Sequence, residues 1–219
     1  MSRIVTQEAV LSYPNLIHPR AAEEGKTPKY GCSLVFLEGV DVKPLKKAAL
    51  DVATATWGDK LKGASIKVLE TQHGPANFLV ADGIRIRLPW RDVPADVAGK
   101  GYPEGSTFVN TNTIRQPQIV TQIPDPETGK PTPLTDESKL RPGAIVKASL
   151  DPYSYDNSGN KGVTFGLGNM QWIRDGDASV IGAKGGPAAA DEFAADADAV
   201  ADLSDLGADT ADDDLSDLL

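Results

Sequence analysis

The segment GAIVKASLDPYSYDNSGNKGVTFGLGNMQWIR, residues 143–174, contains two stretches of alternating apolar residues around a short polar centre. In the second stretch Val163, Phe165 and Leu167 occupy every other position, which places their side chains on one face of a β-strand. The polar centre, residues 156–160, reads Asp-Asn-Ser-Gly-Asn, a composition typical of a hairpin turn. The segment is therefore predicted to form a β-hairpin.

The rest of the chain also favours short strands. It contains 21 Gly and 16 Pro, which interrupt long helices. In residues 84–88 the apolar side chains share one face, and Arg85 and Arg87 point from the other. Strands are predicted at residues 3–13, 29–37, 64–70, 78–88, 107–113, 117–123, 143–150 and 162–174.

A single helix is predicted after the second strand. Asp41 can cap it, Pro44 suits its first turn, and Gly58 ends it. A β-rich chain with one short helix favours an OB-fold barrel or a sandwich over an α/β fold. The apolar residues that recur at helical spacing are Leu45, Ala48, Ala49 and Val52.

The predicted domain is residues 1–181, an OB-fold-like nucleic-acid-binding domain that includes two long loops. The loops, residues 89–106 and 124–143, are rich in Gly and Pro. Residues 182–190 are predicted to be a flexible linker, and residues 191–219 a disordered acidic tail.

Charge is divided unevenly along the chain. The net charge is -9, from 22 Lys and Arg against 31 Asp and Glu. Eleven of the acids lie in residues 188–219, and no Lys or Arg follows Lys184. The 20 acids and 22 bases of residues 1–187 leave that part with a net charge of +2. A mildly basic domain joined to an anionic tail is therefore expected.

Enzyme and metal sites have little support in the sequence. The only His and Cys residues are His18, His73 and Cys32, too few for a zinc cluster. Cys32 lies in an apolar run and is predicted to be a buried small side chain. The Gly25-Lys26-Thr27 tripeptide lacks the upstream Gly of a phosphate loop, since position 20 is Arg. No enzymatic activity and no cofactor are expected.

No apolar run approaches the length of a membrane span, and the first residues lack the apolar core of a secretion signal. A single Cys also fits a reducing compartment. A cytoplasmic location without membrane association is therefore expected.

Binding to single strands without sequence preference needs cations that follow the phosphates and aromatic rings on which bases stack. Both occur between residues 85 and 102, where Trp90 follows Pro89 at a strand end. Trp90 either stacks on bases or closes the core, and the arginines either contact phosphate or are merely solvated. The candidate DNA-binding residues of this group are Arg85, Arg87, Trp90, Arg91, Lys100 and Tyr102.

A second group surrounds the predicted hairpin. Tyr153 and Tyr155 share one face if the strand continues, and they form either a stacking ladder or a packed pair. Arg115 lies in a polar loop where it could reach a phosphate. The candidate DNA-binding residues of this group are Lys147, Tyr153, Tyr155, Lys161 and Arg115. By contrast, Phe165, Trp172 and Trp57 are predicted to pack in the core.

The tail is negatively charged, as a nucleic acid is. On a flexible tether it could occupy the basic surface at high effective concentration, until DNA displaces it for partner proteins. The alternative is a tail that only increases solubility. The candidate partner-binding residues are Asp212, Asp213, Asp214, Asp217, Leu218 and Leu219.

Residues 143–155 and 159–176, with 11–16 and 27–36 near the N-terminus, resemble the phage single-stranded DNA-binding proteins of the T7-like OB-fold type. The resemblance implies an OB fold with a helix inserted after the second or third strand. It also implies an acidic tail that contacts phage or host replication and recombination proteins, and often a homodimer. Such tails commonly end in an aromatic residue, whereas this chain ends in Leu218 and Leu219.

The function expected from these features is sequence-independent binding of single-stranded DNA in phage DNA replication, recombination or repair, inside the bacterial host. The alternative is an interaction protein that acts through its acidic tail, such as a DNA mimic or a phage assembly or regulatory factor, without DNA binding of its own. Salt-dependent binding to oligo-dT distinguishes the two.

Overall fold

The computed structural model describes residues 3–21, 23–72, 74–93 and 101–182. The predicted linker, residues 182–190, apart from Gly182, the predicted tail, residues 191–219, and Lys100 lie outside these residues.

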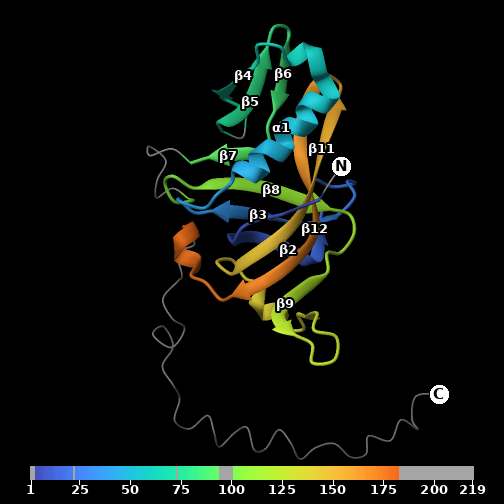
Figure 1. Cartoon of the computed structure of the whole chain (residues 1–219), viewed down its shortest axis with the longest axis vertical. Coiled ribbons are helices and arrows are strands. Elements are labelled where there is room, and N and C mark those ends of the chain that lie inside the picture. Colours follow the sequence, from blue (N-terminus) through green and yellow to red (C-terminus); the bar gives the residue numbers. More distant parts are fainter. Residues whose placement is uncertain (1–2, 22, 73, 94–100, 183–219) are drawn as a thin grey trace, which may run out of the picture. The chain divides into compact units, whose positions relative to one another are not determined.

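Five strands close into a barrel (Figure 1). Around the barrel the order is β2 (Ala9–Arg20), β3 (Lys29–Phe36), β8 (Thr107–Thr113), β12 (Asn160–Arg174) and β11 (Ile145–Asn157). β11 pairs with both β12 and β2, which closes the ring. The β8–β12 pairing is parallel and the other four pairings are antiparallel. Numbered along the chain, the barrel strands follow the order 1-2-3-5-4, a Greek-key arrangement, and the predicted OB-like barrel is confirmed.

Shorter strands extend the barrel. β1 (Ile4–Val5) pairs with β11, and β7 (Trp90–Asp92) pairs with β8. β9 (Ile119–Pro124) pairs with β12 and with β10 (Pro131–Pro133). An arm of three antiparallel strands, β4 (Ser65–Leu69), β5 (Ala76–Ala81) and β6 (Ile84–Arg87), joins the barrel because β6 runs parallel to the start of β12. The 3-10 helices are η1 (Gly58–Leu61), η3 (Glu137–Lys139) and η4 (Ala178–Ile181).

The predicted helix is confirmed as α1 (Lys43–Trp57), between β3 and β4 (Figure 1). The backbone N–H of Lys43 donates to the Asp41 carboxylate at 2.9 Å, and α1 ends at Gly58, whose φ of 44° favours glycine. α1 packs on the β11–β12 side of the core, and the Thr56 hydroxyl donates to Ser154 Oγ at 3.0 Å. Its buried residues are Leu45, Ala49, Val52 and Ala53.

The barrel interior is filled by aliphatic and aromatic side chains. Phe36, Phe165 and Leu150 are almost fully buried there, so the predicted core role of Phe165 is confirmed. Trp57 and Trp172 are partly buried and pack against the same core. Cys32 is buried too, and burial raises the pKa of its thiol to about 12, as expected for a small packing residue. No helix in the described part of the chain has the length and hydrophobicity needed to cross a membrane.

Three predicted strands differ in detail. The segment 3–13 forms two strands, because β1 ends at Val5 and β2 begins at Ala9 and continues to Arg20. The segment 78–88 is a hairpin rather than one strand, because Asp82 and Gly83 form a turn between β5 and β6. β11 runs on to Asn157, seven residues past its predicted end. It meets β12 through a two-residue turn of Ser158 and Gly159, both with positive φ, as a type I′ hairpin requires.

Candidate nucleic-acid interface

The outer surface of the barrel carries polar residues and glycines in register across five strands. Asn15 of β2 pairs with Gly31 of β3, and Gly31 pairs with Asn112 of β8. Asn112 lies beside Gly166 of β12, which pairs with Asp151 of β11. Directly opposed residues point to the same face, so these five define a row across the barrel. Because Gly31 and Gly166 have no side chains, nothing protrudes from the sheet at these two positions of the row.

A second row runs beside the first. Ser12 pairs with Ser33, and Ser33 pairs with Asn110, whose side-chain oxygen accepts a 2.7 Å hydrogen bond from the Ser33 hydroxyl. On the β11–β12 side, Tyr153 pairs with Thr164. We call the outer surface of β3, β8 and β12 that carries both rows the polar face. Ser12 and Ser33 are buried, so Asn110 and Asn112 are the exposed polar side chains of β8 on this face.

The two predicted tyrosines lie beside this face on β11. Tyr153 is 42% exposed and Tyr155 is half-buried, so they are not a packed core pair. Both point outward, because the alternate residues Pro152 and Leu150 face the interior. Burial raises the pKa of Tyr155, and the nearby positive charge of Arg87 opposes that shift. The structure thus brings Tyr153, Tyr155 and Arg87 together.

The arm supplies cations next to these rings. Arg87 pairs with Phe78 of β5 and lies beside Gly162 of β12, while Arg85 pairs with Val80 and is exposed. Among the described residues, neither arginine forms a salt bridge. A recess of about 370 Å³ separates the β5–β6 turn from the β11–β12 turn, lined by Phe78, Gly83, Ile84, Arg85, Gly159, Asn160 and Lys161. Lys161 is less available, since it pairs with Asp156 at 2.7 Å.

Arg91 and Tyr102 are near this surface but already engaged. The Arg91 guanidinium lies 5.8 Å from the centre of the Phe108 ring. Burial lowers the pKa of Arg91, and the charge of Arg87 lowers it further. The Tyr102 ring meets Phe108 edge-on at 4.8 Å, and its hydroxyl donates to Ser12 Oγ at 3.2 Å. Tyr102 is therefore a packed side chain rather than an open ring.

Trp90 corrects one sequence expectation. Its side chain is only 2% exposed, so an exposed ring for base stacking is wrong and the core alternative holds. β7 pairs with β8 so that Trp90 is opposite the buried Val109, and this register turns the indole inward. Outside the core, Lys46 of α1 has its Nζ 5.5 Å from the ring centre.

A recess larger than the one between the β5–β6 and β11–β12 turns was missed by sequence reasoning. It has a volume of about 790 Å³ and lies at the β2–β3 hairpin, at the other end of the polar face from the tyrosines. Tyr13, which is 75% exposed and has a φ of 45°, lines it together with Tyr30. The sequence signal that could have indicated this recess is the presence of three cations and two tyrosines within 18 residues, 13–30. The lining cations are Arg20, Lys26 and Lys29, against one acid, Glu23.

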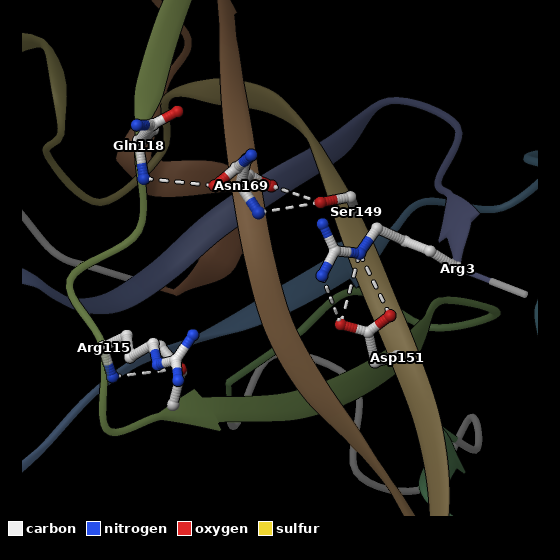
Figure 2. A network of polar contacts seen from close by, with 7 residues as sticks. Arg3, Arg115, Gln118, Ser149, Asp151 and Asn169 are labelled. Carbon is white, nitrogen blue, oxygen red and sulfur yellow. Dashed lines mark hydrogen bonds and ion pairs between the residues drawn. The ribbon is translucent and has the colours of Figure 1, made fainter. Parts of the chain in front are cut away.

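Arg115 and Lys147 lie away from the tyrosines. Arg115 is exposed just after β8, and its backbone N–H donates to Thr113 Oγ1 at 3.3 Å (Figure 2). Thr113 pairs with Tyr30, so Arg115 is closer to the β2–β3 recess. Lys147 is opposite Gln171, eight positions from Tyr155 on β11, or about 26 Å of strand. The structure therefore does not bring Lys147 to the predicted cluster.

Figure 2 shows a polar network on the outer side of β11 and β12. Arg3 donates to both Asp151 oxygens, the shortest contact being 2.8 Å, and so compensates the one acid of the first row. The Asn169 backbone N–H donates to Ser149 Oγ at 2.7 Å, and the Asn169 side-chain oxygen accepts from the Gln118 N–H at 3.3 Å. In the described residues no three His, Cys, Asp or Glu side chains gather as a metal site.

Comparisons with known proteins agree with this arrangement. A family model described as the single-stranded DNA-binding protein of Enterobacter phage Enc34 matches residues 2–204. Putative protein p50 of Acyrthosiphon pisum secondary endosymbiont phage 1 is 24% identical over 187 residues, which is 84% of this chain and 88% of p50.

Solved structures give the same picture of the fold. The single-stranded DNA-binding protein of bacteriophage Enc34 in complex with single-stranded DNA is similar with a TM-score of 0.52 at 18% identity, over 80% of this chain and 88% of that one. The single-stranded DNA-binding protein of bacteriophage T7 gives 0.43 at 12% identity, over 90% and 99%. The Enc34 similarity supports the fold, and the T7 value, below 0.5, adds nothing to it.

Proposed function

The chain belongs to the family of single-stranded DNA-binding proteins described by that of Enterobacter phage Enc34, and we propose that it binds single-stranded DNA without sequence preference along its polar face. In OB folds the ligand crosses the second and third barrel strands between the loops that join strands 1–2 and 4–5. Here those strands are β3 and β8, and those loops are the β2–β3 and β11–β12 turns.

The observation that carries the proposal is that each end of the polar face has both cations and aromatic rings. Arg85, Arg87, Tyr153 and Tyr155 lie at the β11–β12 end. The β2–β3 end offers the cations and tyrosines of the 790 Å³ recess. The cations suit the phosphates, and the rings suit unpaired bases, which stack on any aromatic surface with little regard to sequence.

The acidic tail adds a competitor to this proposal. Asp212, Asp213, Asp214 and Asp217 carry the charge of a short nucleic acid, and a tether raises their local concentration at the polar face. In this mechanism DNA releases the tail, whose last residues, Leu218 and Leu219, then contact replication or recombination proteins of the phage or host.

The test is a titration of the full chain, and of a variant that lacks residues 188–219, with oligo-dT and with duplex DNA over a range of salt. The proposal expects tighter binding to oligo-dT, with an affinity that falls steeply as salt rises. If the tail-deleted protein has no affinity for oligo-dT at low salt, DNA binding is refuted and an interaction role for the tail remains.

A further inference from the structure

Tyr155 lies across a glycine. It pairs with Gly162 on β12, and a Cβ added to Gly162 would be 2.5 Å from Tyr155 Cζ and 2.7 Å from Cε1, with the hydroxyl nearer still. Real Cβ atoms do not approach other atoms so closely, so any residue other than glycine at position 162 would displace the end of the Tyr155 side chain from this position. The φ of Gly162 is not in the left-handed region, so the space and not the backbone conformation requires glycine.

The neighbouring tyrosine makes a useful contrast. Tyr153 has Gly166 beside it, but a Cβ there would lie 3.5 Å from Tyr153 Cε1, an ordinary van der Waals distance. Gly166 can therefore accept a methyl group without moving Tyr153. Of the two glycines, only Gly162 lets a tyrosine ring, that of Tyr155, lie closer to the β12 backbone than a side chain would allow.

Arg87 completes the arrangement. It is next to Gly162 on the other side of β12, so Tyr155, Gly162 and Arg87 span three adjacent strands. The ring lies over Gly162 and is partly exposed to solvent. A base stacked on the exposed part of the ring would have its phosphate within reach of a cation that has no acidic partner among the described residues.

We propose that Gly162 is the positioning residue that lays Tyr155 across β12, and that this ring gives the protein its preference for unpaired bases over duplex DNA. The inference rests on the proposed DNA binding and adds a cause for its specificity. Arginines attract the phosphates of either form, whereas an open ring is useful only to a base that is not already stacked inside a helix.

The experiment compares Gly162→Ala with the control Thr54→Ala, an exposed position of α1 outside the polar face, both in the full chain, by measuring affinity for oligo-dT and for a duplex of equal length. Gly162→Ala is expected to weaken oligo-dT binding by about 5- to 150-fold, the range for loss of one base–aromatic stack. Duplex binding should change by less than about twofold, because the cations are untouched. Thr54→Ala should leave both affinities near those of the unsubstituted protein.

Tyr155→Ala and the double variant Gly162→Ala/Tyr155→Ala separate positioning from packing. Tyr155→Ala should lower the preference for oligo-dT over duplex DNA. Adding Gly162→Ala to Tyr155→Ala should have no further effect, because the ring that the methyl group would displace is already absent. Thermal unfolding checks that each variant is folded. If Gly162→Ala does not fold, the two Tyr155 variants still test the proposal.

The outcomes are distinct. Loss of stability with an unchanged ratio of oligo-dT to duplex affinity would mean that Tyr155 only covers Gly162, and the inference would be wrong while DNA binding stands. If the protein without substitutions binds neither oligo-dT nor duplex DNA, the proposed function itself is wrong.

Discussion

Replacing Arg85 and Arg87 together by glutamine removes two cations from the β11–β12 end of the polar face. Each phosphate contact with single-stranded DNA contributes about 0.7 to the slope of log affinity against log salt, so losing both lowers the slope by about 1.4. Between 50 and 200 mM salt, a fourfold change, this corresponds to about a sevenfold smaller loss of affinity than in the unchanged protein. Arg85 and Arg87 lack salt bridges in the described structure, so no internal pair should mask the effect.

The assay is fluorescence anisotropy of labelled oligo-dT at several salt concentrations, with the tail-deleted protein so that the acidic segment does not compete. Lys43→Gln is the matched control, because Lys43 is an exposed cation at the start of α1, outside the polar face. A slope that stays the same in the double variant, or that falls equally in Lys43→Gln, would show that DNA does not pass this end of the face.

Three further predictions concern the core, the hydrogen-bonded carboxylate of Asp92 and the tail. Trp90→Ala should destabilise the fold by about 3–5 kcal/mol in urea unfolding, because the indole is buried, and a loss below about 1 kcal/mol would contradict the core assignment. The Asp92 carboxylate accepts hydrogen bonds from Lys46, Thr107 and Asn77. Although burial raises its pKa, these bonds outweigh burial and hold the pKa below its ordinary value. Its stabilisation should be present above about pH 4 and lost as pH falls through the lowered pKa. Asp92→Asn should therefore cost about 1–2 kcal/mol at pH 7, less at pH 3, and an equal cost at both would refute this account. Deleting residues 188–219 should tighten oligo-dT binding, and unchanged or weaker binding would rule out competition by the tail.

The sequence predicted the fold well because the information was local. Alternation identified most of the strands, including Val163, Phe165 and Leu167, and Pro44 and Gly58 marked the ends of α1. It could not give the pairing of β11 with β2, which depends on contacts between residues far apart in the chain.

The interface was predicted only in part, for physical reasons. Tyr153, Tyr155, Arg85 and Arg87 come together because β6 runs beside β12, a contact that no local pattern encodes. Trp90 was ambiguous since its direction depends on the register of β7 against β8. The β2–β3 recess was missed because β2 continues through two prolines to Arg20, whereas the predicted strand ended at residue 13.

The first row of the polar face draws on strands from both ends of the chain, from Asn15 to Gly166. During synthesis β2 and β3 leave the ribosome long before β12, so a partly made chain has only half of this surface. The ability to bind single-stranded DNA should therefore appear only after β12, the last barrel strand, has left the ribosome.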